Sequence, residues 1–272
     1  MTMSQKDRAA AFHAAHAPGK IIALANVWDA ASARVVEECG AEGLATSSAA
    51  VAWTHGYRDG EALSLKILLT AVAEIVRAIK VPLSVDMEQG YASDARGVEA
   101  NVAAAIDAGA IGMNIEDGRE PPDLLAQKIE AARRASNAAG VKFFINARTD
   151  VYLKKLVPEE AALKETLARA AKYQSAGCDG VFVPGVIDIA TFQTIVKAVS
   201  LPVNAMARPG LPPVSELKAA GVRRVSAGTG AWRAAFGGLR SGALQMLKEG
   251  RYDAMNNVDA SLFSANALFP EA

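Results

Sequence analysis

Two carboxylates follow one apolar run of the chain, and their spacing points to chemistry. In the stretch SVDMEQGY, residues 84–91, Asp86 and Glu88 are two positions apart. Side chains at that spacing on a strand share a face, so the two acids project the same way. Because neighbouring like charges repel, a proton, a basic group or a cation must compensate them. Carboxylate oxygens suit Mg²⁺, and a solvated turn after a strand is the other interpretation.

Arg148 and Glu116 end two further apolar runs and would complete such a site. The planar guanidinium can hold a substrate carboxylate through two parallel bonds, whereas an ion pair with a nearby acid would make it structural. If Glu116 lies beside Asp86 and Glu88, three carboxylates converge. A cation held there would act as a Lewis acid on a carbonyl or hydroxyl oxygen. The site would then fit an anionic, oxygen-rich ligand.

Eight short apolar runs supply the elements that would position these residues. They cover residues 21–27, 43–48, 82–87, 111–117, 143–150, 180–185, 202–207 and 224–229. Ala-rich segments with helical spacing separate them, and several end in Ala-Gly, which is a helix C-cap signal. Near-continuous apolar strands are typical of parallel sheets covered on both faces. Strand and helix repeated eight times predict an α/β fold, a closed (β/α)₈ TIM barrel, with an open doubly wound sheet as the alternative.

The bulk composition indicates one unit in a reducing compartment. Barrels reach 272 residues as one domain, so we expect a single domain over residues 1–272, with an extra N-terminal helix and further helices from about residue 240. The 29 basic and 29 acidic side chains balance, which gives no sign of nucleic acid or an anionic membrane as partner. No apolar run reaches the roughly 18 residues of a membrane span. Two distant cysteines and no signal-peptide core favour a cytoplasmic protein.

In such barrels the active site lies at the carboxyl ends of the strands, and polar residues gather there in this chain. The strand-end residues are Asn26, Trp28, Asp29, Thr46, Ser47, Ser48, Asp86, Glu88, Asn114, Glu116, Asp117, Asn146, Arg148, Thr149, Asp150, Asn204, Arg208, Ser226 and Thr229. No strand ends in lysine, which argues against a Schiff-base aldolase. The histidines form no metal cluster: we expect His13 and His16 on the surface of the first helix and His55 in a loop.

Taken together, these motifs resemble those of the isocitrate lyase and phosphoenolpyruvate mutase superfamily. The stretch GYRDGE is similar to a family loop that bears an aspartate, here Asp59. VDMEQGY is similar to the family's metal motif, with Glu88 in place of its second aspartate. IEDG gives Glu116 and INARTDVYL gives Arg148. The similarity extends from about residue 26 to about residue 238.

The resemblance implies a Mg²⁺ site, or a Mn²⁺ site, that binds 2-oxo acids or their enolates. Asp86 would hold the metal directly or through water. Asp59, Glu88 and Glu116 would act mainly through metal-bound waters. Arg148 would bind the substrate carboxylate, so that Asp59, Glu116 and Arg148 are the candidate catalytic residues.

The resemblance also implies where the remaining substrate oxygens would bind. Ser47, with backbone N–H groups near Ser48 and Ala49, would hold the oxygens of the oxo acid, as small residues at a strand end allow. Asn204, which ends the seventh run, is a further candidate for substrate binding. Family barrels pair by exchanging C-terminal helices, so we expect a homodimer or homotetramer.

The chain departs from the family's lyases after Glu116. Those lyases carry a Lys-Lys/Arg-Cys-Gly-His loop there whose cysteine is the catalytic acid, whereas this chain reads EDGREPPDLLAQKIEAA. The resemblance therefore implies a Mg²⁺-dependent lyase-type enzyme that cleaves a C–C or C–P bond of a small 2-oxo or 2-hydroxy acid through an enolate, with Tyr57, His55 or Tyr91 as other acids. The alternatives are an oxaloacetate decarboxylase, a phosphonopyruvate hydrolase or mutase-like activity, and a weakly catalytic oxo-acid-binding barrel.

Overall fold

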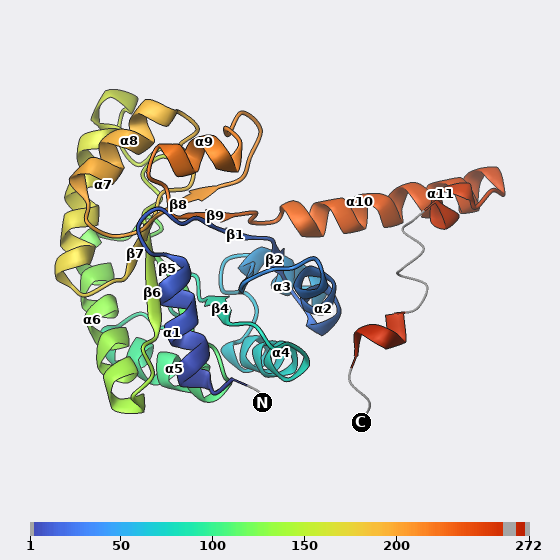
Figure 1. Cartoon of the computed structure of the whole chain (residues 1–272), viewed down its shortest axis with the longest axis horizontal. Coiled ribbons are helices and arrows are strands. Elements are labelled where there is room, and N and C mark those ends of the chain that lie inside the picture. The colour runs from blue at the N-terminus through green and yellow to red at the C-terminus, as the bar shows by residue number, and fades with distance from the viewer. Residues whose placement is uncertain (1–2, 258–264, 270–272) are drawn as a thin grey trace.

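The computed structural model describes residues 3–257 and 265–269, and the strands among them are all parallel. The strands are β1 (Ile22–Leu24), β2 (Asn26–Val27), β3 (Leu44–Thr46), β4 (Leu83–Asp86), β5 (Gly112–Glu116), β6 (Phe144–Arg148), β7 (Gly180–Phe182), β8 (Val203–Met206) and β9 (Arg224–Ser226). Their order in the sheet is β1-β9-β8-β7-β6-β5-β4-β3-β2. The predicted (β/α)₈ barrel is confirmed (Figure 1).

The first strand is divided in two, and this division closes the ring. Strand β1 pairs with β9, while β2, which begins two residues after β1 ends, pairs with β3. Each of the eight predicted apolar runs contains a strand, and each strand is shorter than its run because the last residues of the run turn towards the mouth of the barrel. These turning residues are the ones available for a site.

Helices alternate with the strands, and most of them cover the outside of the ring. They are α1 (Gln5–Ala15), α2 (Ala30–Glu38), α3 (Ser48–Thr54), α4 (Leu65–Ala78), α5 (Ala95–Asp107), α6 (Pro122–Ala139), α7 (Glu159–Ser175), α8 (Ile189–Ala198), α9 (Val214–Ala219), α10 (Gly230–Leu244), η1 (Gln245–Glu249) and α11 (Asp253–Asn256). Side-chain caps begin several of them: Asp94, for example, accepts a hydrogen bond from the N–H of Gly97 at 2.8 Å.

Strands β5 and β6 form the longest pairing and bring two predicted site residues together. In this register Glu116 lies opposite Arg148, and Gly112 lies opposite Phe144. A Cβ atom at Gly112 would come within 2.7 Å of the carbonyl oxygen of Phe144, so only glycine fits at that position. The close approach at the start of the two strands fixes the register, and the register places the acid beside the arginine at their ends.

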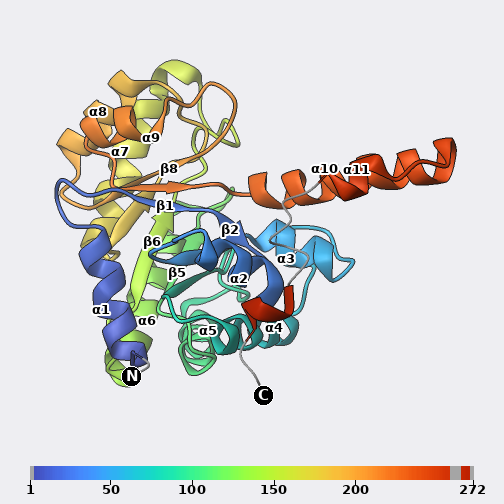
Figure 2. The ribbon, with the colours of Figure 1, turned by 45° about the vertical axis from the view of Figure 1, so that its right-hand side comes forward.

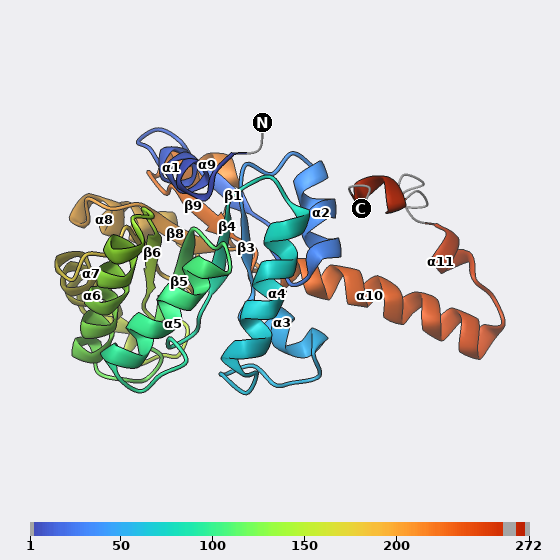
Figure 3. The same cartoon turned by 90° about the horizontal axis from the view of Figure 1, so that it is seen from below.

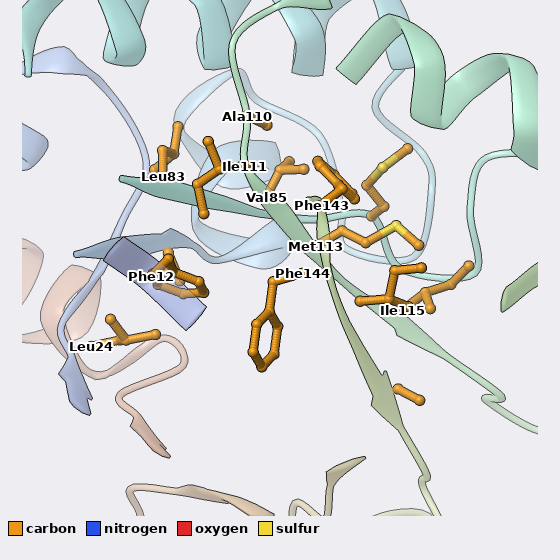
Figure 4. Packing of buried hydrophobic residues seen from close by; sticks show 14 of the residues in the cluster. Phe12, Leu24, Leu83, Val85, Ala110, Ile111, Met113, Ile115, Phe143 and Phe144 are labelled. Atoms are coloured by element: carbon orange, nitrogen blue, oxygen red, sulfur yellow. The ribbon is translucent and has the colours of Figure 1, made fainter. Parts of the chain in front are cut away.

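Helix α1 closes the amino-terminal end of the barrel, where Figure 4 shows Phe12 beside Phe144. The ring centroids of these residues are 5.5 Å apart in an edge-on arrangement. His16 stacks on Phe144 at 4.4 Å and is only 2% exposed, so the prediction that it lies on the helix surface is wrong. The reason is helical spacing, because residues four apart share a face and His16 follows Phe12 into the core.

Helix α10 extends away from the barrel instead of packing back on it (Figure 2). Its base is held on the barrel: Trp232 meets Trp53 of α3 with ring centroids 4.9 Å apart, and Phe236 meets Trp28 at 6.3 Å. Figure 3 shows the rest of the helix standing clear of the ring. The further helices predicted beyond residue 240 are present as η1 and α11, while residues 258–264 and 270–272 of that tail lie outside the described residues. Over the described residues, none of the helices combines the length and apolarity that crossing a bilayer demands.

Candidate active site at the carboxyl ends of the strands

Asp86 ends β4 and is buried at the mouth of the barrel. Its backbone N–H donates to the Thr46 hydroxyl at 2.8 Å, and its Oδ2 accepts the backbone N–H of Ser48 at 3.2 Å. Ser47 is the N-cap of α3, and its hydroxyl accepts the N–H of Ala50 at 3.4 Å. The predicted juxtaposition of the Ser47–Ser48 turn with Asp86 is therefore present, and the first turn of α3 faces the acid.

The backbone N–H groups predicted to hold the substrate oxygens at this turn are partly engaged by the protein itself. The N–H of Ser47 donates to the carbonyl of Val27 at 3.2 Å, and the N–H of Ser48 is directed to Asp86. Within the described residues the N–H of Ala49 finds no acceptor. Of the three predicted residues, Ala49 thus offers the backbone donor that is open to a ligand.

Glu88 lies in a turn and is turned towards the loop that carries Asp59. Its φ of +47° is unusual for a residue with a side chain. One carboxylate oxygen accepts the N–H of Glu61 at 2.7 Å, and the other accepts the Tyr91 hydroxyl at 3.1 Å. In return, the Glu61 carboxylate accepts the backbone N–H groups of Gln89 and Tyr91 at 3.0 and 2.8 Å. This reciprocal clasp ties residues 57–63 to the turn after β4.

Arg148 lies between two acids at the end of β6. Its Nη1 is 2.6 Å from Glu116 Oε2, and its Nε donates to Asp150 Oδ1 at 2.7 Å. Lys154 adds a second cation, with Nζ 3.3 Å from Glu116 Oε1 and 2.7 Å from Asp150 Oδ2. Within the described residues, Arg148 Nη2 makes no hydrogen bond or ion pair. Both interpretations of this arginine thus remain compatible, because it is paired with protein acids and keeps one edge open.

A buried group behind the mouth fixes Asp150. Asp117, a strand-end acid, accepts the N–H of Asp150 at 2.9 Å through Oδ1. Its Oδ2 accepts from Arg169 at 2.8 Å and from the Tyr173 hydroxyl at 2.7 Å, both on α7. Asp117 therefore faces the helices and supports the site from outside, because successive side chains of a strand alternate between the two faces.

Asn204 lies inside the barrel, below the mouth. It is buried, and its Nδ2 donates to the Ser226 hydroxyl at 3.1 Å. Arg224 donates to the same hydroxyl at 3.3 Å and to Asn114 Oδ1 at 3.2 Å. The substrate-binding role of Asn204 stays a prediction, since its recorded hydrogen bonds go to the interior of the barrel.

The convergence of acids changes their protonation. Burial raises the pKa of Asp86, and the charge of Arg148 opposes part of this rise. Burial, followed by the charge of Asp86, raises the pKa of Glu88 to about 7. Burial raises the pKa of Glu116 to about 7, against the opposing charge of Arg148 and with a further rise from Asp150. Burial is thus the main cause of these shifts, and neighbouring acids add to it.

Arg148 responds in the opposite sense. Burial alone would lower the pKa of its guanidinium, but Glu116, Asp150 and Asp86 together raise it above the usual value. The arginine is therefore always charged. A permanent cation next to carboxyl groups that titrate near neutrality suits the binding of an anion.

The donor set fits a hard divalent cation with one direct ligand. Across residues 3–257 and 265–269, no three His, Cys, Asp or Glu side chains form a ready cage for a metal. Both Glu88 oxygens are engaged by the loop, while Asp86 Oδ1 has only a long contact, 3.5 Å, from the N–H of Glu88. Mg²⁺ retains several waters and is held by one or two carboxylates, which matches this arrangement.

Sequence reasoning missed Lys154, Glu61 and the pair Arg169 and Tyr173. One signal was available: Lys154 follows Asp150 by four residues, the spacing at which side chains meet on a helical turn. None of the described strands ends in lysine, but Lys154 reaches the mouth of the barrel from the loop after β6. The residues on α7 carried no such signal, because their partner Asp117 lies on another element.

Comparison with known proteins gives consistent matches over most of the chain. A family profile described as phosphoenolpyruvate phosphomutase matches residues 12–247. An uncharacterised protein of Mycobacterium tuberculosis (strain H37Rv) is 32% identical over 222 residues, which are 80% of this chain and 81% of that protein. An oxaloacetate decarboxylase of Marinomonas sp. (strain MWYL1) is 28% identical over 269 residues, which are 97% of this chain and 92% of that enzyme.

A solved structure agrees with these matches. The crystal structure of a Burkholderia cenocepacia J2315 protein that carries a provisional phosphonomutase name is 40% identical and superposes with a TM-score of 0.85. The superposition covers 91% of this chain and 100% of that one.

Proposed function

Because the chain belongs to the phosphoenolpyruvate phosphomutase family, we propose that it is a Mg²⁺-dependent lyase-type enzyme that acts on a small 2-oxo or 2-hydroxy carboxylic acid through an enolate. The observation that carries this proposal is the mouth of the barrel. There a permanently charged Arg148 with an open edge stands beside carboxyl groups whose pKa values are raised. This arrangement supports the binding of an anion and of a cation side by side.

The residues divide the work as follows. Arg148 would grip the substrate carboxylate through Nη2, and the N–H of Ala49 would donate to a substrate oxygen on the opposite side. Asp86 would hold Mg²⁺ directly, with Asp59, Glu88 and Glu116 acting through its waters. Bound there, Mg²⁺ would supply Lewis acidity at the oxo and carboxylate oxygens.

Among such reactions, decarboxylation of oxaloacetate is favoured by a specific observation. A relative that spans 97% of this chain is named an oxaloacetate decarboxylase. Loss of CO₂ breaks the C3–C4 bond, leaves its electron pair on C3 as the enolate of pyruvate, and ends when C3 takes up a proton. Departing CO₂ needs no proton, so the reaction is consistent with the short, cysteine-free stretch that follows Glu116.

A coupled assay tests the proposal. We would incubate the protein with Mg²⁺ and oxaloacetate and follow pyruvate through its reduction by lactate dehydrogenase. Oxaloacetate also decarboxylates with free Mg²⁺, so Asp86→Asn protein at the same metal concentration gives the background. Pyruvate formation well above that background supports the decarboxylase. Oxalate binding without turnover of oxaloacetate, phosphonopyruvate or 2-methylisocitrate would favour the weakly catalytic barrel instead.

We also propose that the whole chain of residues 1–272 works as one domain in a cytoplasmic homodimer or homotetramer. Both cysteines are free: Cys39 is exposed and Cys178 is buried. Helix α10, which leaves the barrel, supports assembly because its outer part exposes Leu239 and the following η1 exposes Leu247, at 58% and 78% of their full areas. Packing this helix on a second copy would remove that apolar area from water.

A further inference from the structure

Lys154 brings a charge into the mouth of the barrel that the proposed chemistry does not use. Its ammonium lies 2.7 Å from Asp150 Oδ2 and 3.3 Å from Glu116 Oε1. Asp150 is fully buried, and the Lys154 side chain is 34% exposed. The neighbouring Lys155 is exposed, and no ion pair is recorded for it among the described residues. Two contacts with acids that already hold Arg148 distinguish Lys154 from a solvated surface lysine.

The charges of the mouth show what Lys154 changes. Glu116 and Asp150 carry two negative charges when ionised, and Arg148 carries one positive charge. Asp86 adds a further acid whose charge reaches the guanidinium. Without Lys154, two ionised acids would face one arginine, and this excess of negative charge would oppose the binding of an anion at its open edge. With Lys154, each of the two acids that touch Arg148 has a cation of its own.

Geometry points the same way as charge. The two oxygens of Asp150 are divided between the cations, with Oδ1 on Arg148 Nε and Oδ2 on Lys154 Nζ. The two oxygens of Glu116 are divided in the same manner, with Oε2 on Arg148 Nη1 and Oε1 on Lys154. Each carboxylate thus has a cation beside both of its oxygens, which favours this orientation over one turned towards the remaining nitrogen, Nη2.

We propose that Lys154 is a positioning residue for substrate binding. It neutralises and orients Glu116 and Asp150 so that Arg148 presents Nη2 to the substrate carboxylate without an excess of negative charge from these two acids. This inference rests on the proposed function, because it assigns Lys154 a part in the same anion-binding site. It concerns affinity for an anion and requires no proton transfer by the lysine.

The inference predicts that loss of the Lys154 charge has different effects on the binding of oxalate and on the binding of Mn²⁺. Lys154→Met should weaken binding of oxalate in saturating Mn²⁺ by roughly tenfold or more, since a cation near the anion is lost. The same variant should bind Mn²⁺ alone as tightly as the wild type or more tightly, because a repelling charge is gone. Isothermal calorimetry measures both. Lys154→Arg should recover most of the oxalate affinity, and Lys155→Met should bind both ligands like the wild type.

The outcomes separate this inference from the function on which it rests. A wild-type protein that does not bind oxalate with Mn²⁺ removes the oxo-acid site and the role of Lys154 together. If the wild type binds oxalate and Lys154→Met binds it equally well, only the role of Lys154 is overturned. Weakening of both ligands, without recovery in Lys154→Arg, shows a structural lysine and also overturns it. Should Lys154→Met fail to fold, Lys154→Gln provides the same comparison with a polar side chain.

Discussion

Arg148 pairs with acids of the protein itself. Its role is therefore either to bind the substrate or to stabilise the fold, and binding measurements distinguish the two. If its open Nη2 binds the substrate carboxylate, Arg148→Ala should reduce oxalate affinity by about 30-fold to several-thousand-fold, equivalent to roughly 2–5 kcal/mol. Arg148→Lys should recover only part of this loss, because an ammonium lacks the planar fork. Calorimetric titration with oxalate and Mg²⁺ measures the change.

The structural alternative gives a different pattern. Removal of Arg148 leaves Glu116 and Asp150 with Lys154 alone, so some loss of thermal stability accompanies either role. A folded Arg148→Ala protein with wild-type affinity for oxalate would show that the arginine only balances its neighbours. The oxalate measurement, and not the melting temperature, therefore decides the role.

The raised pKa values of Glu88 and Glu116 predict how stability varies with pH. Both folded values are about 7, above the ordinary value of 4.5, so the folded state binds more protons between these pH values. Stability without metal should therefore fall as pH rises from about 4.5 to about 7, by on the order of 1–3 kcal/mol per group.

Mg²⁺ should oppose this fall because it favours the ionised carboxylates. We expect the rise in melting temperature on adding Mg²⁺ to be larger at about pH 8 than at about pH 5.5. Scanning fluorimetry at both pH values measures this rise. Asp86→Asn is the control, and its melting temperature should not rise with Mg²⁺ at either pH. A metal effect that is equal at both pH values would argue against titrating acids in the metal site.

At this scale the sequence identified the mouth but not how its members are paired. The end of an apolar run predicts the end of a strand. This made it possible to identify the site residues Asp86, Glu88, Glu116 and Arg148 from the sequence. Glu88 nevertheless directs its carboxylate to the loop after α3, owing to a positive φ that no residue pattern revealed. Lys154 was overlooked because its place depends on how the chain turns after β6.

At the scale of elements, the clasp between Glu61 and Glu88 governs the loop that carries Asp59. Glu61→Ala removes the acceptor of two backbone N–H groups, those of Gln89 and Tyr91. We expect these two amides to exchange with solvent faster, and stability to fall by about 1–3 kcal/mol, since their bonds are lost in a half-buried place. Hydrogen exchange read by NMR measures each amide separately.

Glu61→Gln is the matched control for this prediction. Both amides donate to Oε1, and glutamine retains that oxygen without the negative charge. Exchange at Gln89 and Tyr91 should therefore remain near the wild-type rate. Equal exchange in the alanine variant and the wild type would mean that the loop is held by other contacts.

The sequence predicted the strands more completely than it predicted individual side-chain contacts. All eight predicted apolar runs contain strands because apolar residues on both faces of a parallel sheet give an unbroken signal. The clasp and the Asp117–Arg169 pair had no such signal, since they join residues 27 and 52 positions apart through contacts that only the closed barrel creates.

At the scale of the whole molecule, α10 predicts assembly. Its outer half exposes Leu239 and Leu244, and η1 beyond it exposes Leu247, all of which a monomer in water would leave uncovered. Light scattering at micromolar concentration should give the mass of a dimer or tetramer. The double substitution Leu239→Asp and Leu247→Asp should shift that mass to the monomer, because a buried charge opposes association.

A second exposed apolar residue provides the control. Ile187 lies in the loop before α8, far along the chain from α10, and is also exposed. Ile187→Asp should leave the mass unchanged. A wild-type protein that scatters as a monomer would reject the assembly outright. The residue pattern predicted extra helices at this end of the chain, and the family resemblance implied that they are exchanged between subunits, which stays a prediction. The pattern itself did not show the direction of α10, because the surface that it would cover lies on another copy.

The base of the barrel has a consequence for synthesis on the ribosome. Phe12 faces the guanidinium of Arg224 with 5.9 Å between the ring centre and the central carbon, so the first helix covers the last strand. Translation at about 5–20 residues per second separates these two residues by roughly 10–40 seconds. For that interval the nascent helix carries Phe12 without Arg224, although Phe144, its other partner, is made earlier. The first helix is therefore synthesised before the last strand that it covers, and the base of the barrel closes only after β9 has left the ribosome.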